Sequence, residues 1–161
     1  MSQEIQQKIL TPHQTQAIEA AHGKVHVLCI GISEYSTTSG FSKLPVCVND
    51  AAMVANCFRV VRELNADKNH ITLITSKDQL VSKGSILGGV HKLATYAEDS
   101  DRILFYFSGH GQRLNDEDEF YLVPQDVFHA DHKATLLSFS EIIHLLNESD
   151  AKQKFAILNV G

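Results

Sequence analysis

The chain has 161 residues, of which 43% are hydrophobic and 20% are charged, a composition typical of one folded domain with a sizeable core. Its formal net charge of −5 gives no basis for binding nucleic acid or an anionic membrane through a basic surface. No apolar run approaches the roughly 18 residues that a membrane-spanning helix needs, and the first residues lack the pattern of a secretory signal. Three cysteines without paired spacing favour a reducing compartment, so we expect a cytoplasmic protein.

The first predicted element is a helix that begins at Thr11. Thr11 is a suitable N-cap, Pro12 suits the first helical position, and Gln14 completes a capping box. Gly23 is a good residue to end this helix. We therefore expect residues 1–24 to form an N-terminal helical extension or a short pro-region.

Apolar segments rich in β-branched and aromatic residues predict the strands of the domain. Four long segments are expected to be buried strands, and a shorter one is expected to be a hairpin arm. The four strands are residues 25–32, 70–75, 102–107 and 154–160, and the hairpin arm is residues 120–124.

Helical spacing of apolar residues separates these strands. Asn49 or Asp50 is expected to cap a helix whose apolar stripe consists of Val54, Phe58, Val61 and Leu64. A second helix is expected over residues 82–98. A third should begin at the capping box that Ser138 and Glu141 form.

Strands that alternate with helices predict an α/β fold with three layers: a mainly parallel sheet of about four core strands with helices on both faces. Such sheets bind ligands beyond the carboxyl ends of their strands. His110 follows the third long strand, and Gly161 follows the fourth. If these strands are neighbours, about 5 Å apart, position 161 lies within side-chain reach of His110. A nucleophile and its base require this arrangement.

Five segments in this order resemble the caspase and metacaspase clan of cysteine peptidases. They are "VLCIGISEY", "LPVCVNDA", "LFYFSGHG", "YLVPQD" and "FAILNVG". "FYFSGHG" is highly specific for the clan, and "CVNDA" looks more like metacaspases than like animal caspases. The resemblance implies that residues 25–161 form a caspase-like large-subunit domain that ends at the expected nucleophile position.

The resemblance also implies roles for individual residues. His110 would be the catalytic base, and the N–H of Gly111 would form part of an oxyanion hole. The family places an Asp and a nucleophilic Cys where this chain has Asn159 and Gly161. A chain without that thiol should not hydrolyse peptides by the family's mechanism. It is therefore a truncated or altered piece of an active peptidase, a natural pseudoenzyme, or a protein in which another thiol such as Cys47 serves.

The family's pattern implies a substrate pocket and partners. Asp50 is either a helix cap or, as in metacaspases, a carboxylate that binds a Lys or Arg of the substrate beside position 159. Cys29 and Cys57 are expected to be small core hydrophobes. The partner would be a protein or peptide substrate, a small-subunit half, or a homologous chain along the exposed sheet edge. A regulatory binding module is the alternative to a peptidase.

The residue types raise the question of two metal sites, one for calcium and one for zinc. Acidic residues after His110, with Asp118 and Asp126 as weak candidates, are oxygen ligands suited to Ca²⁺. A solvated acidic hairpin is the preferred interpretation, and no cofactor is expected. His129, His132 and His144 lack the spacing of a zinc site, and we expect them to be surface residues.

Overall fold

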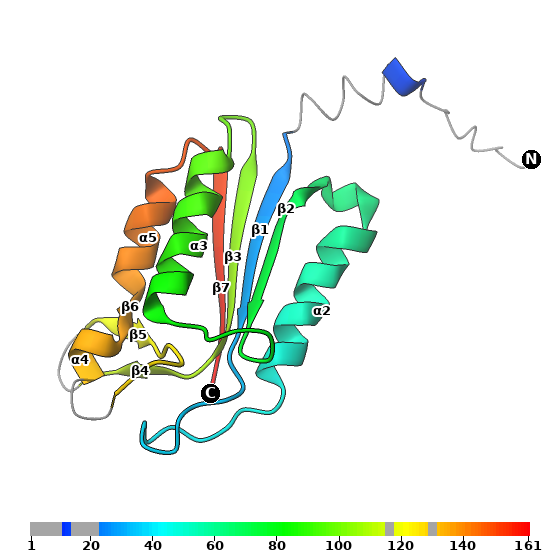
Figure 1. Ribbon diagram of the computed structural model, residues 1–161. Helices are drawn as coiled ribbons and strands as arrows, with labels where there is room; N and C mark the ends of the chain where they lie inside the picture. The colour runs from blue at the N-terminus through cyan, green and yellow to red at the C-terminus, as the bar shows by residue number, and fades with distance from the viewer. Residues whose placement is uncertain (1–10, 14–22, 115–117, 129–131) are drawn as a thin grey trace, which may run out of the picture.

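A computed structural model describes residues 11–13, 23–114, 118–128 and 132–161, so most of the expected N-terminal helix lies outside the described residues. The chain alternates strands and helices as the sequence predicts (Figure 1). Within the described ranges, none of the helices combines the length and hydropathy that a bilayer crossing needs. The elements are β1 (Val25–Gly31), α2 (Cys47–Val60), the 3-10 helix η1 (Arg62–Leu64), β2 (Ala66–Thr75), α3 (Lys83–Tyr96), β3 (Arg102–Gly109), β4 (Gly111–Arg113), β5 (Phe120–Leu122), α4 (His132–Thr135), β6 (Leu137–Ser138), α5 (Phe139–Asn147) and β7 (Gln153–Val160).

The main sheet has four strands in the order β2-β1-β3-β7, and each neighbouring pair is parallel. β1 and β3 are central and almost wholly buried, which explains their continuous apolar sequences. β7 is an edge strand and is mostly exposed. The predicted mainly parallel α/β sheet is confirmed.

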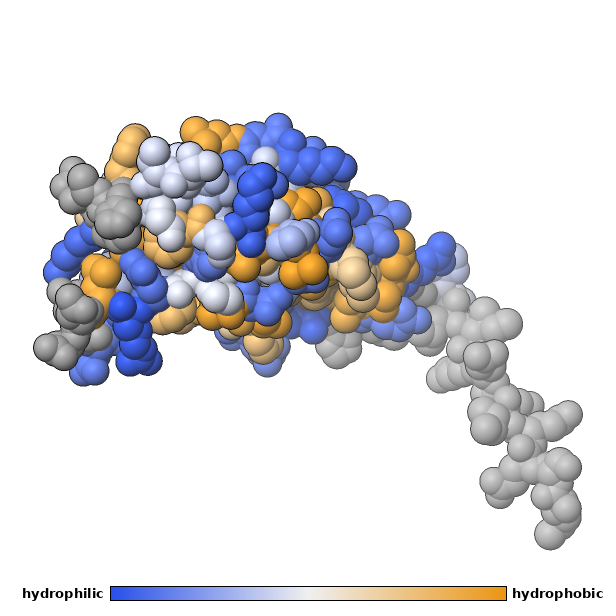
Figure 2. Space-filling model, turned by 90° about the horizontal axis from the view of Figure 1, so that it is seen from below, coloured by the Kyte–Doolittle hydropathy of each residue, from blue (hydrophilic) through white to orange (hydrophobic). Residues whose placement is uncertain are grey.

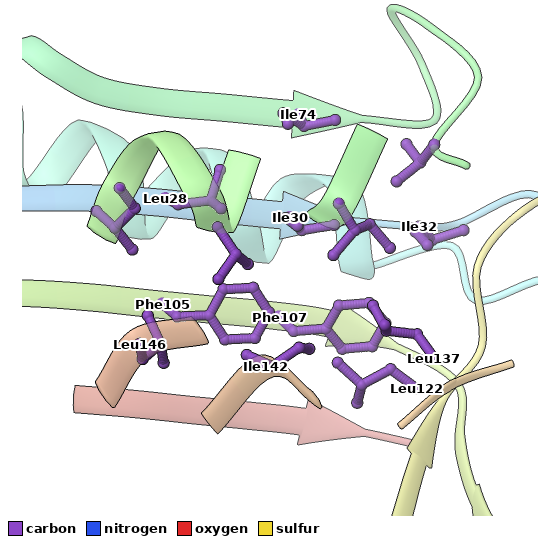
Figure 3. Packing of buried hydrophobic residues seen from close by; sticks show 14 of the residues in the cluster. Leu28, Ile30, Ile32, Ile74, Phe105, Phe107, Leu122, Leu137, Ile142 and Leu146 are labelled. Carbon is purple, nitrogen blue, oxygen red and sulfur yellow. The ribbon is translucent and has the colours of Figure 1, made fainter. Parts of the chain in front are cut away.

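Helices cover both faces of this sheet, because successive strand side chains point to opposite sides (Figure 1). α2 packs on one face through Ala51 and Ala55, against Leu104 and Tyr106 among others. α3 and α5 pack on the other face. There the fully buried side chains of β1 and β3 meet those of the two helices, as Figure 3 shows for Leu28, Ile30, Phe105, Phe107, Ile142 and Leu146.

A second, antiparallel sheet follows the carboxyl end of β3. β5 pairs with β4 and with β6, in the order β4-β5-β6. The expected hairpin arm at residues 120–124 is therefore confirmed, whereas the short β4, β6 and α4 were missed. These elements are only two to four residues long, too short for a hydrophobic period to appear in the sequence.

The helix expected to be capped by Asn49 or Asp50 begins earlier, at Cys47. Its first turn has no side-chain cap of its own; instead the hydroxyl of Ser33 accepts a hydrogen bond from the N–H of Val48 at 3.0 Å. The capping group comes from a distant loop, so local sequence could not reveal it. The helix also ends sooner than its predicted stripe, because the backbone at Val61 is extended and Leu64 belongs to η1.

Asp101 joins three elements at the amino end of the sheet. Its carboxylate accepts hydrogen bonds from the backbone N–H of Lys24 at 2.8 Å, the backbone N–H of Glu98 at 3.0 Å and Nε2 of His26 at 2.7 Å. Burial alone would raise the pKa of Asp101, but these hydrogen bonds outweigh it and lower the pKa below its ordinary value of 3.8. The ionised carboxylate therefore stabilises the folded chain.

Replacing this carboxylate should make the chain less stable in a pH-dependent way. We expect Asp101→Asn to lower the free energy of unfolding by about 2 kcal/mol near neutral pH, because charged hydrogen bonds are lost. A lowered folded-state pKa stabilises above the ordinary value of 3.8 and stops doing so as pH falls through the folded-state pKa. Urea denaturation across that range should show the difference from wild type shrinking in acid.

The neighbouring Asp99 provides the matched control, because it is exposed. Asp99→Asn should leave the free energy of unfolding within about 0.5 kcal/mol of wild type. An equal loss of stability in the two variants, or a loss in Asp101→Asn that does not change with pH, would contradict the assigned role.

Candidate active site at the carboxyl edge of the sheet

The parallel pairing of β3 with β7 brings the two predicted residues of the site together. Ser108 lies opposite Asn159, and Gly109 lies opposite Val160. The backbone N–H of Gly161 extends the ladder by donating to the carbonyl of Gly109 at 3.2 Å. Figure 2 views the molecule from this end, where hydrophobic residues are interspersed with hydrophilic ones.

Both ring nitrogens of His110 lie within hydrogen-bond distance of backbone carbonyls. Nδ1 is 3.0 Å from the carbonyl oxygen of Gly161, and Nε2 is 2.8 Å from that of Ser42. A neutral imidazole has one N–H and can donate to only one of these oxygens. If Nε2 donates to Ser42, Nδ1 is left as the basic nitrogen, and it faces position 161.

Tyr35 holds the backbone of His110 in place. Its hydroxyl accepts a hydrogen bond from the N–H of His110 at 2.9 Å and donates to the carbonyl of Val123 at 3.4 Å. The Tyr35 and His110 rings are 5.0 Å apart, and the Phe41 ring is 5.3 Å from His110. Burial raises the pKa of Tyr35 well above its ordinary value, against a smaller lowering by the His110 N–H, so the hydroxyl keeps its proton.

Gly111 lies in β4 opposite Leu122 of β5. The adjacent N–H of Val123 donates to the carbonyl of His110 at 3.0 Å. Hydrogen-bonded and non-hydrogen-bonded pairs alternate along an antiparallel ladder, so the N–H of Gly111 faces away from β5. A Cβ at this position would lie 2.5 Å from the Phe120 ring and 3.0 Å from Val160, so a larger residue here would force the Phe120 ring to shift.

Gly161 has room for a side chain. Among the non-adjacent residues that the structure describes, a Cβ built there would meet only Leu44 within 4 Å, at 3.5 and 3.9 Å. These are ordinary van der Waals distances. The backbone therefore does not need glycine at the position where the family places its nucleophile.

Asp50 and Asn159 lie together beside this position. Nδ2 of Asn159 donates to the Asp50 carboxylate at 3.0 Å and also lies 3.2 Å from the Ser108 hydroxyl. Ser108 in turn donates to Asp50 at 3.5 Å, a long hydrogen bond. Asp50 is therefore not the N-cap of α2 but a carboxylate in its first turn, directed at the end of β7.

The three cysteines have different surroundings. Cys29 is fully buried, and burial raises the pKa of its thiol to about 12, so the prediction of a core residue is confirmed. Cys57 is exposed, and that prediction was wrong because its side chain lies on the outer surface of α2. Cys47 is buried at the first residue of α2, while His110 makes its described contacts with Gly161, Ser42 and Tyr35.

The described residues of the acidic segment have partners of their own. Asp126 accepts a hydrogen bond from the N–H of Lys83 at the start of α3, and Glu119 accepts two from Ser140. Those donated hydrogen bonds lower the pKa of Glu119. In the described part of the chain, no group of three or more His, Cys, Asp or Glu could hold a metal ion.

The other metal candidates are only partly described. Asp118 is exposed. His129 and the side chain of His132 lie outside the described residues. His144 lies 3.5 Å from Glu148 on the exposed surface of α5.

Sequence reasoning missed Tyr35 and Ser42 as parts of the site. Tyr35 was noted only as the end of "VLCIGISEY", and Ser42 contributes a backbone carbonyl that any residue type carries. No residue pattern could have identified Ser42. A large aromatic residue in a loop otherwise rich in Ser, Thr and Gly is the one sequence signal that could have pointed to Tyr35.

A family model described as "Metacaspase, peptidase C14 domain" matches residues 26–153. The match covers most of the chain and includes the strand that leads to His110. The chain therefore belongs to the metacaspase family of C14 peptidase domains, and the resemblance seen in its motifs is confirmed.

Two named relatives and one solved structure are similar to the chain. Metacaspase-1 of Cryptococcus neoformans var. neoformans serotype D is 30% identical over 121 residues, covering 68% of this chain and 25% of that protein. Metacaspase-2 of Arabidopsis thaliana is 25% identical over 122 residues, covering 71% of this chain and 28% of that protein. The chain thus spans about a quarter of each relative. A protein from Geobacter sulfurreducens has the same fold, with a TM-score of 0.64, 20% identity, and coverage of 84% of this chain and 50% of its own.

Removing the Tyr35 hydroxyl should loosen His110 without changing the fold. In Tyr35→Phe, the N–H of His110 loses its acceptor, and we expect the free energy of unfolding to fall by about 1–2 kcal/mol. Hydrogen exchange at the His110 amide should accelerate, and the imidazole nitrogen signals should move in NMR spectra. Tyr96→Phe removes the hydroxyl of a 59% exposed tyrosine and should change neither. Unchanged exchange at His110 in Tyr35→Phe would show that Tyr35 does not position it.

Proposed function

We propose that the chain is the large-subunit half of a metacaspase-like cysteine endopeptidase, in which His110 is the general base and position 161 carries the nucleophile. The observation that supports this most strongly is the geometry of His110. Its Nδ1 faces position 161 at 3.0 Å from the backbone oxygen, and its Nε2 lies on the Ser42 carbonyl. A carbonyl that fixes the tautomer of the base performs the orienting role that catalytic dyads need.

The proposed chemistry is acyl transfer. A thiolate at position 161 attacks the scissile carbonyl carbon, and the resulting oxyanion accepts a hydrogen bond from the N–H of Gly111. His110, which took the thiol proton, donates it to the leaving amine as the C–N bond breaks. Water then hydrolyses the thioester, with His110 again as base, and releases the acid product.

Asp50 would select a basic side chain in the substrate. Its carboxylate lies beside position 161 through its hydrogen bond with Asn159. Where the family pattern has a second carboxylate, Asn159 supplies an amide that donates to Asp50, so the pocket carries one negative charge fewer. We infer a Lys or Arg preference that is weaker than a pair of carboxylates would give.

The chain with glycine at position 161 has no nucleophile there, and we infer that it is inactive as given. The buried Cys47 is a poor substitute, because a thiol must be ionised and accessible to attack. The second candidate function is therefore a non-catalytic, caspase-shaped binding module. The room for a side chain at Gly161 favours the peptidase, whereas the hydrogen bond between Asn159 and Asp50 favours a pocket adapted to binding alone.

Either function would use the exposed edge strand β7. Phe155 and Ile157 are 49% and 50% exposed, and β7 hydrogen-bonds within the described sheet only to β3. An open edge with apolar side chains can accept another strand. We infer that the small-subunit half or a homologous chain adds to the sheet at this edge.

We infer the compartment from the thiols. Cys29, Cys47 and Cys57 are all free, and none is held in a disulfide. Free thiols persist in reducing compartments. This supports a cytoplasmic location.

A thiol introduced at position 161 tests the role of His110 without requiring peptidase activity. We expect Gly161→Cys to be alkylated by iodoacetamide at about neutral pH at least tenfold faster than the same variant carrying His110→Ala, because the imidazole raises the thiolate fraction. Peptide mass spectrometry would give the rate at each cysteine. The exposed Cys57 serves as an internal reference, and its rate should be equal in the two proteins.

Equal alkylation of the introduced thiol with and without His110 would contradict the proposed dyad. The unaltered chain should release no fluorophore from Arg or Lys peptides, with or without calcium. Cleavage that is lost on Cys47→Ser would instead identify Cys47 as the nucleophile.

A further inference from the structure

A cavity of about 400 Å³ lies at the opposite end of the sheet from His110. It is formed where the edge strand β2 and the start of β1 face the carboxyl-terminal half of α3. Its size is within the range of small-molecule sites. The residues that line it are His26, Val27, Leu28, Asn69, His70, Thr72, Gly89, Lys92, Leu93 and Tyr96.

Three aromatic rings are stacked along this cavity. The His26 and His70 rings are 4.5 Å apart with an interplanar angle of 20°, and the His70 and Tyr96 rings are 5.5 Å apart with an angle of 12°. His70 therefore lies between the other two. Tyr96 ends the stack and is 59% exposed, so a planar ligand can reach its ring from solvent.

His26 is the most deeply buried polar residue of the lining, at 3% exposure. Its Nε2 lies 2.7 Å from the Asp101 carboxylate, which can only accept, so Nε2 carries the hydrogen. Nδ1 is buried and has no hydrogen-bond partner among the described residues. A buried polar atom without a partner costs free energy, and in the neutral ring this one is an acceptor.

The charge of the lining is positive. Lys92 is the charged residue of the cavity, and it lies one helical turn before Tyr96 on α3. No Asp or Glu is among the residues that line the cavity in the described part of the chain. An anionic group is therefore the best match for Lys92, while the ring stack selects a planar body.

We propose that this cavity binds a small heteroaromatic carboxylate, separately from the candidate active site. The partly exposed His70 ring turns outward, and the aromatic ring of the ligand takes its place against Tyr96. The carboxylate of the ligand pairs with Lys92, and a ring N–H of the ligand donates to Nδ1 of His26. One ligand thus contacts the Tyr96 ring, the Lys92 ammonium and the unpartnered Nδ1 of His26.

Indole-3-carboxylate is a suitable probe, because it has a planar ring, a carboxylate and one N–H. The chain contains no tryptophan, so indole fluorescence excited beyond the tyrosine absorption reports only the probe. Titration with the protein should give saturable binding and a change in probe emission. The imidazole nitrogen signals of His26 should move in NMR spectra over the same concentration range, and those of His110 should not.

Matched ligands and variants separate the three contacts. Indole without the carboxylate and 1-methylindole-3-carboxylate without the N–H should each bind about tenfold more weakly. Lys92→Met should weaken the probe about tenfold yet leave indole unaffected, and Tyr96→Leu should weaken both. Lys77→Met, at an exposed lysine near the other end of β2, is the control and should bind like wild type.

The exposed positions of Lys92 and Tyr96 make loss of folding a poor explanation for these effects. Absence of saturable binding by the wild-type chain would overturn the proposal. Equal binding by wild type and Lys92→Met, or equal losses in Lys92→Met and Lys77→Met, would also overturn it.

Discussion

The in-register parallel pairing of β3 with β7 is the constraint on which the rest of the candidate site depends. It aligns Ser108 with Asn159 and Gly109 with Val160, and therefore delivers position 161 to the side of His110. These residues are about fifty positions apart in the chain. A shift of one residue would turn every side chain of β7 to the other face of the sheet. The partly buried Leu158, which packs against the core, and the exposed Ile157 lie on opposite faces, which favours this register.

A second level of organisation comes from the loops around this pairing. The loop after β1 supplies Tyr35 to the His110 backbone, the Ser42 carbonyl to its ring, and the Ser33 hydroxyl to the first turn of α2. That turn in turn presents Asp50 to Asn159. The loop is thus held against His110 and against the first turn of α2. Its polar groups orient the site while the sheet behind them supplies the rigidity.

Much of this fold could be predicted from the sequence, because long buried strands and amphipathic helices have strong periodicities. The strands that include Val25 and Phe105 and the helix that begins after Ser82 were placed within a few residues. Short elements and contacts through the backbone could not be predicted. Ser42 acts through its backbone carbonyl. The first turn of α2 is capped by Ser33, which lies fourteen positions before the helix begins at Cys47. Cys57 was misplaced because an apolar thiol next to Phe58 gives no local sign of which helix face it occupies.

The geometry also limits how the two candidate functions can differ. The orienting carbonyl, the tyrosine beneath His110 and the carboxylate of Asp50 do not involve the side chain at position 161. A peptidase and a binding module could therefore share every one of these contacts. Only the peptidase additionally requires a sulfur at position 161, because a glycine hydrogen can neither ionise nor form a thioester. The proposed binding of a basic side chain would depend on Asp50, to which Asn159 donates a hydrogen bond where a second carboxylate would repel it. Loss of the nucleophile would thus leave these contacts in place, since none of them involves a side chain at position 161.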